Sequence, residues 1–121
     1  MSYQSYAAQA KASESPRDLE IRAVSFVTRQ LIEANTTGGD LLARIRALNA
    51  NMRLWAVMVE DLSQPGNALP TAIKARYVSL GSFAKRHSVA SLMDGSDMST
   101  LIQINTDVLE AFEHQRKSVA A

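Results

Sequence analysis

The sequence predicts an all-α protein in which four main helices form a compact antiparallel bundle, with a short helical segment at the N-terminus. Apolar residues recur at spacings of three and four along most of the chain, and no segment of strand length alternates with a period of two. Segments containing Pro and Gly divide the chain into helical pieces. The connections are roughly four to six residues long, and connections this short favour antiparallel neighbours.

The length and composition of the chain indicate a single domain and exclude several classes of protein. The 121 residues fit a single domain, 1–121, that can bury its own core. The absence of cysteine excludes disulfides and thiolate sites. A net charge of +1 makes a nucleic-acid partner an unfavourable interpretation, because such proteins carry a basic excess. No apolar run is long enough to cross a membrane, and residues 1–12 do not resemble a secretory signal. We therefore expect a cytoplasmic protein without membrane contact.

Residues 1–12 form an N-terminal segment with two alternative interpretations. Tyr3, Tyr6, Ala7 and Ala10 recur at helical spacing. Because isolated helices of this length are marginal in water, the segment is either a short helix or a tail that becomes ordered only on contact with something else.

The first main helix is predicted to begin at Ser15-Pro16 and to run to about Asn35. A Ser hydroxyl can accept a hydrogen bond from a free backbone N–H group, and Pro is well tolerated at the first helical position. Asp18 places negative charge near the positive end of the helix dipole. The inner face is expected to carry Leu19, Ala23, Phe26, Val27 and Leu31.

The second helix, from Asp40, has the clearest apolar pattern. Its apolar residues follow alternating spacings of four and three, which is typical of helices packed at shallow crossing angles; they are Leu41, Ile45, Leu48, Met52, Trp55, Val59 and Leu62. Leu42, Leu54 and Met58 widen this stripe, which predicts a central helix that contacts several neighbours.

Residues 64–67, with Pro65 and Gly66, end this helix, and Pro70 opens a third that runs to about Met93. Its inner face is predicted to contain Ile73, Tyr77, Leu80 and Phe83. Gly81 costs about 1 kcal/mol of helix propensity relative to Ala, and a close approach between helices is one reason to retain it. Residues 94–97 should cap the fourth helix, with Leu101, Ile104, Val108, Ala111 and Phe112 facing inward and residues 116–121 fraying.

No catalytic or metal-binding pattern is present. His87 and His114 lie on different predicted helices, and neither forms a His-x-x-x-His or Glu-x-x-His pair. Gly38-Gly39 is not followed by the Lys-Ser/Thr of a P-loop. Glu60 and Asp61 are adjacent, so their side chains point about 100° apart on a helix. The sequence therefore predicts a protein that is not an enzyme and needs no metal or cofactor. His87 is interpreted as a packed, hydrogen-bonded or capping residue, with a pH sensor or partner contact as the alternative.

Trp55 is the leading candidate for a partner contact. A lone Trp within an apolar stripe is usually a core residue, but aromatic residues also dominate interface hot spots. If the stripe is wider than its own neighbours can cover, a groove remains for a partner's amphipathic helix. The arginines of the first two helices are either solubilising residues or a polar rim for such a groove; they are Arg22, Arg29, Arg44, Arg46 and Arg53.

Several stretches, in order, resemble one family. They are Ser13-Glu14-Ser15-Pro16-Arg17-Asp18-Leu19-Glu20, Leu48-Asn49-Ala50-Asn51-Met52-Arg53-Leu54-Trp55 and Gln64-Pro65-Gly66-Asn67-Ala68-Leu69-Pro70, together with Tyr3-Gln4-Ser5-Tyr6 and Phe83-Ala84-Lys85-Arg86-His87. From about Tyr3 to Phe112 the chain is similar to FlaF, small helical proteins of flagellated bacteria.

The resemblance implies a regulator that is needed for flagellin to be made and secreted. FlaF is thought to bind flagellin as an export chaperone and to act against FlbT, the repressor of flagellin mRNA translation. We therefore expect a flagellin terminal helix as the partner, with FlbT as a second partner. The alternative is a regulator that acts through FlbT or flagellin mRNA without binding flagellin. Self-association through the apolar stripe is a third interpretation, so monomer and homodimer both remain open. The candidate partner-binding residues are Tyr3, Tyr6, Asn51, Arg53, Leu54, Trp55 and Met58.

Overall fold

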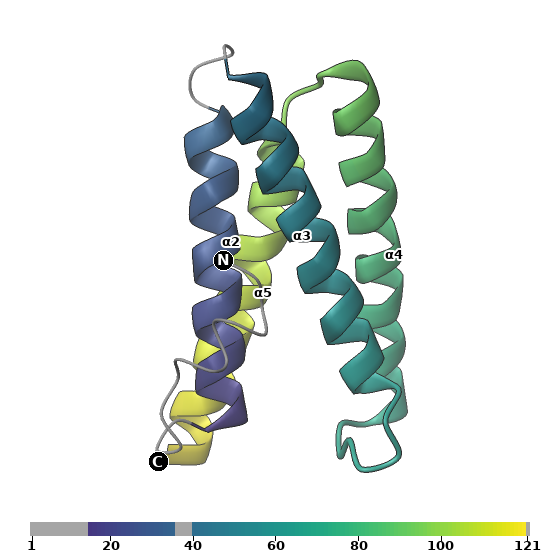
Figure 1. Ribbon diagram of the computed structural model, residues 1–121. Coiled ribbons are helices and arrows are strands. Elements are labelled where there is room, and N and C mark those ends of the chain that lie inside the picture. The colour runs from purple at the N-terminus through teal and green to yellow at the C-terminus, as the bar shows by residue number, and fades with distance from the viewer. Residues whose placement is uncertain (1–14, 36–39, 121) are drawn as a thin grey trace.

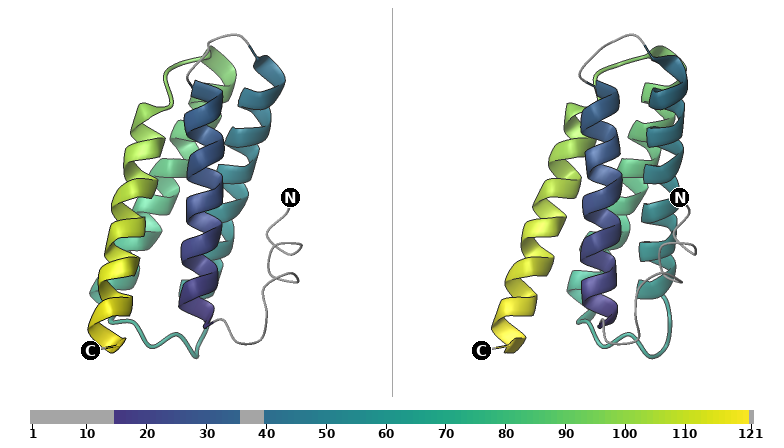
Figure 2. Two further views of the ribbon diagram at one scale, coloured as in Figure 1. Left: turned by 90° about the vertical axis from the view of Figure 1, so that its left-hand side faces the viewer. Right: turned by 60° about the vertical axis from the view of Figure 1, so that its left-hand side comes forward.

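The computed structural model describes residues 15–35 and 40–120, and its side chains through residue 115. Within these residues four helices and no strands are present: α2 (Pro16–Asn35), α3 (Leu41–Leu62), α4 (Thr71–Asp94) and α5 (Ser99–Ala120). The helices alternate in direction and form an antiparallel bundle (Figure 1, Figure 2). The predicted all-α fold is confirmed. The N-terminal segment, residues 1–12, lies outside the described residues, and α5 continues beyond Arg116 to Ala120.

Caps mark the helix boundaries, and the one at Ser15 follows the prediction from the sequence. Before α2, Ser15 Oγ accepts a hydrogen bond from the backbone N–H of Asp18 at 3.1 Å. Before α3, the Asp40 carboxylate accepts one from the backbone N–H of Ala43 at 3.2 Å. After α4, Gly95 takes the left-handed conformation, with φ of 71°, which glycine adopts at little cost. Each cap provides a partner for a backbone group that the helix end leaves free.

The four helices do not pack equally against one another. Helix α3 packs against both α2 and α4, as the predicted central position requires, and α2 packs against α5 as well. Contacts between α4 and α5 are the sparsest of these neighbouring pairs. In Figure 1, α2 and α5 accordingly lie together on one side, while α3 and α4 lie together on the other.

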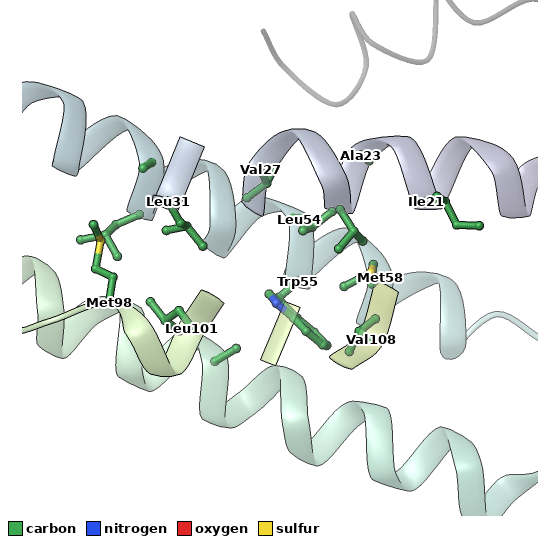
Figure 3. Packing of buried hydrophobic residues seen from close by; sticks show 14 of the residues in the cluster. Ile21, Ala23, Val27, Leu31, Leu54, Trp55, Met58, Met98, Leu101 and Val108 are labelled. Carbon is green, nitrogen blue, oxygen red and sulfur yellow. The ribbon is translucent and has the colours of Figure 1, made fainter. Parts of the chain in front are cut away.

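The core is formed mainly by side chains of α2, α3 and α5, which point toward one another in Figure 3. On α2, the predicted core residues Ala23, Val27 and Leu31 are buried, whereas Leu19 and Phe26 are half-buried. On α5, Leu101, Val108 and Phe112 are buried as predicted, and Ile104 and Ala111 are half-buried.

On α3 the buried face differs from the predicted stripe. Leu48 and Trp55 are buried, but Leu41 is 67% exposed, and Met52 and Val59 are only half-buried. Of the positions that were expected only to widen the stripe, Leu54 and Met58 are buried, whereas Leu42 is 54% exposed. The reason is that α3 contacts α2 on one flank and α4 on the other, so its buried surface is centred between two neighbours.

The predicted inner face of α4 is wrong at Phe83, which is 42% exposed; Ile73, Tyr77 and Leu80 are half-buried. The buried residues of this helix are small: Gly81, Ala84, Ser88 and Ser91. A Cβ atom at Gly81 would lie 2.6 Å from Val59 Cγ2 and 3.1 Å from Trp55 Cε3. Helix α4 therefore approaches α3 closely through a stripe of small residues, which leaves its larger apolar side chains at the edges of the contact.

Candidate partner-binding site

A cavity of about 300 Å³ lies at the end of the bundle where α2 begins and α3 is connected to α4. We call it the basal cavity. All four helices and the α3–α4 connection line it, through Arg17, Glu20, Trp55, Met58, Asp61, Leu62, Asn67, Ala68, Leu69, Tyr77 and Phe112.

The connectivity of the bundle explains why the cavity forms at this end. Helices α2 and α3 are joined at the opposite end, as are α4 and α5, so both helix pairs are held together there (Figure 1). At the basal end only α3 and α4 are joined, and α4 makes few contacts with α5. At this end the pair α2 and α5 therefore lies apart from the pair α3 and α4, as Figure 1 shows.

The cavity wall is largely apolar and aromatic. The side chains of Trp55, Met58 and Phe112 belong to the buried core and present part of their surface to the cavity. The rings of Tyr77 and Phe112 are tilted by 47°, with centroids 6.0 Å apart, within the range of favourable aromatic pairs. Half-buried Leu69, in the α3–α4 connection, is also part of the lining. An apolar wall of this kind is suited to an aliphatic or aromatic side chain.

Charged side chains border the cavity on the α2 and α3 sides. The Arg17 guanidinium lies over the Phe112 ring, 4.1 Å from its centroid, and Arg17 Nη1 lies 3.8 Å from Glu20 Oε2. Burial raises the pKa of the Glu20 carboxyl; Arg17 opposes this shift, and Asp61 adds to it. Burial also raises the pKa of the Tyr77 phenol. The rim thus holds two carboxylates and one guanidinium beside an apolar interior.

A second hollow, of about 340 Å³, lies between α4 and α5. We call it the side furrow; it is lined by Ile73, Arg76, Tyr77, Leu80, Asp107, Val108, Ala111 and Gln115. Tyr77 belongs to the walls of both hollows, so the two are neighbours. The predicted inner face of α4 therefore contributes to an open furrow, which follows from the sparse contacts between α4 and α5.

The structure brings only some of the predicted partner-binding residues together. Trp55 and Met58 line the basal cavity, whereas Leu54 and Asn51 are buried in the core and do not line it. Arg53 is exposed on α3. Tyr3 and Tyr6 lie outside the described residues.

The remaining wall residues were not predicted as a site. Arg17 and Glu20 lie in one of the stretches that carry the resemblance to FlaF, residues 13–20, and Phe112 is predicted only as a core residue. The turn at residues 64–70 is another of these stretches. Its Asn67, Ala68 and Leu69 line the cavity.

A chain of buried hydrogen bonds explains why Asn51 and Trp55 are inside the protein. Trp55 Nε1–H donates to Asn105 Oδ1 at 3.0 Å, and Asn105 Nδ2 donates to Asn51 Oδ1 at 2.8 Å. Asn51 Nδ2 donates to Ser88 Oγ at 3.2 Å, and the Ser88 hydroxyl donates to the Ala84 carbonyl at 2.7 Å. This network links α3, α4 and α5 and fixes the orientation of the Trp55 ring at the cavity wall.

The arginines and His87 have separate roles. The Arg44 guanidinium donates to the backbone carbonyls of Ser91 and Ser96, and so ties α3 to the end of α4. The other four, Arg22, Arg29, Arg46 and Arg53, are exposed and none lines the basal cavity. His87 is half-buried and stacks on Phe83, with centroids 5.7 Å apart, which confirms that it is packed. Its Nε2 has no hydrogen-bond partner among the described residues.

Two further findings concern the described part of the chain. No group of three or more His, Asp or Glu side chains in residues 15–35 and 40–115 is placed to hold a metal ion. None of the four helices combines the length and apolar character that a transmembrane span requires.

Together these features define an all-α bundle protein with an apolar, charge-bordered cavity at its basal end. The chain belongs to the FlaF family: the model of that family, described as flagellar protein FlaF, matches residues 2–112. Comparison with curated proteins and with solved structures gave no match.

Proposed function

We propose that this flagellar protein is a cytoplasmic chaperone that binds flagellin and promotes its synthesis and export, and that the basal cavity receives side chains of an amphipathic terminal helix of flagellin. The observation that carries the proposal is the cavity itself, about 300 Å³ between apolar and aromatic walls. Amphipathic helices bind such grooves by inserting apolar side chains spaced three or four residues apart. Membership of the FlaF family supports flagellin as the source of the helix.

The side furrow supports the same mode of binding. Because Tyr77 is shared by the two hollows, a helix can place one anchor in the basal cavity and lay its next turn against the furrow. The furrow offers Ile73, Leu80 and Val108 as apolar contacts. Burial of apolar surface drives such binding at about 25 cal/mol per Å², less the cost of ordering the bound segment.

The substitution that best tests this proposal is Leu69→Asp. Leu69 lies in the α3–α4 connection and is only half-buried, so a carboxylate can be placed at the cavity without opening the core. Trp55→Ala is less informative, because Trp55 is 2% exposed and hydrogen-bonded to Asn105. Its loss would reduce both the stability of the fold and the binding of a partner. We expect Leu69→Asp to weaken flagellin binding by at least tenfold, or about 1.4 kcal/mol, measured by calorimetry with the purified chain.

Val78→Asp is the matched control. It introduces the same charge at an exposed apolar residue of α4 that lines neither hollow, and we expect it to bind flagellin within about twofold of the native chain. Equal losses in the two variants would contradict binding through the basal cavity.

Ionic strength separates this function from the alternative of regulation through flagellin mRNA, and direct capture separates it from regulation through FlbT. Apolar binding to flagellin should persist at high salt, whereas binding driven by RNA phosphates falls steeply. A chain that captures FlbT or flagellin mRNA, but not flagellin, would overturn the chaperone proposal in favour of that alternative.

A further inference from the structure

We propose that residues 1–14 of the same chain occupy the basal cavity when no partner helix is bound, so that the N-terminal segment competes with the partner. This inference concerns regulation of the site, and its inhibitory part rests on the proposed function. Its first argument is position. Helix α2 begins at the rim of the cavity, because Arg17 and Glu20, both near its start, line it.

The length and direction of the segment allow this placement. A residue that precedes proline is disfavoured in the helical conformation, so Ser15 before Pro16 marks a break between α2 and the segment before it. As a helix, these residues would span roughly 21 Å at 1.5 Å per residue, which is ample for a segment tethered at the cavity rim.

The chemistry of the segment matches that of the cavity. Tyr3, Tyr6, Ala7 and Ala10 follow the i, i+3, i+4, i+7 spacing of one helical face. A Tyr ring can pack against Phe112 and the other aromatic side chains of the wall, and its hydroxyl can donate to a carboxylate. The Glu20 carboxylate is a suitable acceptor, since burial disfavours its charge and its contact with Arg17 is long, at 3.8 Å.

Because the segment is tethered to the site, even a weak interaction is enough for it to occupy the basal cavity. A segment joined to its site by a short linker has an effective concentration in the millimolar range, so even a millimolar interaction is substantially populated. A partner helix must then displace the segment, which lowers its apparent affinity by roughly two- to tenfold. The same factor applies to every partner helix, so only helices that match the cavity well retain a useful affinity.

Seating of the segment can be tested in the full chain without flagellin. The chain has no cysteine, so Ser5→Cys provides a single attachment point for a nitroxide spin label, at a position that helical spacing sets opposite Tyr3 and Tyr6. We expect the label to broaden the amide signals of Leu69 and Phe112 selectively, and to spare Met98 at the far end of the bundle. Tyr3→Ala/Tyr6→Ala should abolish this broadening, whereas the matched control Gln4→Ala/Gln9→Ala should preserve it.

Two results of this experiment would overturn the proposal. One is the absence of selective broadening at the basal cavity. The other is broadening that passes from a labelled chain to a separate isotope-enriched chain, which would show that the segment occupies the cavity of a second copy.

Inhibition is tested by the affinity of the same variants for flagellin. We expect Tyr3→Ala/Tyr6→Ala to bind flagellin roughly two- to tenfold more tightly than the native chain, and Gln4→Ala/Gln9→Ala to be unchanged. Unchanged or weaker binding by the tyrosine variant would overturn the inhibitory role, and weaker binding would mean that the tyrosines contact the partner. If even the native chain does not bind flagellin, the proposed function and the inhibition both fail, while the spin-label result still decides whether the segment occupies the cavity.

Discussion

At the scale of single residues, Trp55 and Asn51 show how one motif serves both folding and the site. Trp55 contributes its ring to the cavity wall, while its Nε1–H group donates to Asn105. Asn51 is fully buried and forms hydrogen bonds with both Asn105 and Ser88. Buried amides are costly unless they are paired, and a satisfied network favours one arrangement of the helices. These two residues therefore position the cavity wall as well as stabilising the core.

Asn105→Ala tests the network. The substitution leaves Trp55 Nε1–H and Asn51 Oδ1 without the partner that each has in the native protein. We expect the free energy of unfolding to fall by about 2–4 kcal/mol, measured by urea denaturation followed by circular dichroism. Thr100→Ala, at an exposed position of the same helix, should change it by less than about 0.5 kcal/mol. A fully stable Asn105→Ala variant would show that the network does not hold α3 to α5.

At the scale of elements, the limits of α4 were predictable but its buried face was not. Pro70 and Gly95 are strong local signals, and the helix spans Thr71–Asp94 between them. Apolar periodicity identifies a face by its large side chains, but here the contact with α3 is made by Gly81, Ala84 and two serines. Small residues carry little hydropathy signal. Which of them form an interface depends on how closely two helices approach, and a single sequence does not specify that distance.

Gly81→Ala tests the close contact between α3 and α4. Alanine improves helix propensity by about 1 kcal/mol, but its Cβ would lie 2.6 Å from Val59 Cγ2. Valine is stiff at χ1, and the Trp55 ring on the other side is held by Asn105, so neither neighbour can move away easily. We expect a net loss of about 1 kcal/mol in the free energy of unfolding, measured by urea denaturation.

Two companion variants make this result specific. Gly66→Ala, where no atom lies within 4 Å of the added Cβ, should change the free energy of unfolding by less than about 0.5 kcal/mol. Val59→Ala should lower the free energy of unfolding less in the Gly81→Ala variant than in the native chain, because it removes the methyl group that clashes with the added Cβ. Strictly additive losses would argue against the clash.

At the scale of the whole molecule, the basal cavity is assembled from residues that are far apart in the chain. The sequence indicated Trp55 and Met58 as candidates, and the resemblance drew attention to the turn at residues 64–70. Arg17 and Phe112 meet only because α2 packs against α5, which places the guanidinium over the ring. Local patterns predict that a helix has an apolar face, but they do not predict at which end of the bundle the helices diverge.

The two ends of the bundle should respond oppositely to pH. At the far end, hydrogen bonds from Ser96 and Asn35 lower the pKa values of Asp94 and Asp97, respectively, below 3.8. Their contribution to stability is complete above pH 3.8 and is lost as the pH falls through the lowered values. At the basal end, burial raises the pKa of Glu20 above 4.5, so its contribution is complete below pH 4.5 and is lost as the pH rises through the raised value.

Urea denaturation over a series of pH values measures both effects. Glu20→Gln removes the buried charge, so it should increase the free energy of unfolding at neutral pH and lose this advantage below pH 4.5. Asp97→Asn should decrease stability at neutral pH, and the decrease should disappear in strong acid. A stabilising effect of Glu20→Gln that is the same at all pH values would contradict burial of the charge as its cause.

The position of Trp55 also gives the protein an optical reporter of its own. It is the sole tryptophan, its indole is held in one orientation by Asn105, and one side of it forms the wall of the basal cavity. A molecule that enters the cavity changes the surroundings of this chromophore, so its fluorescence should change. Occupancy of the cavity can thus be titrated by fluorescence with unmodified protein.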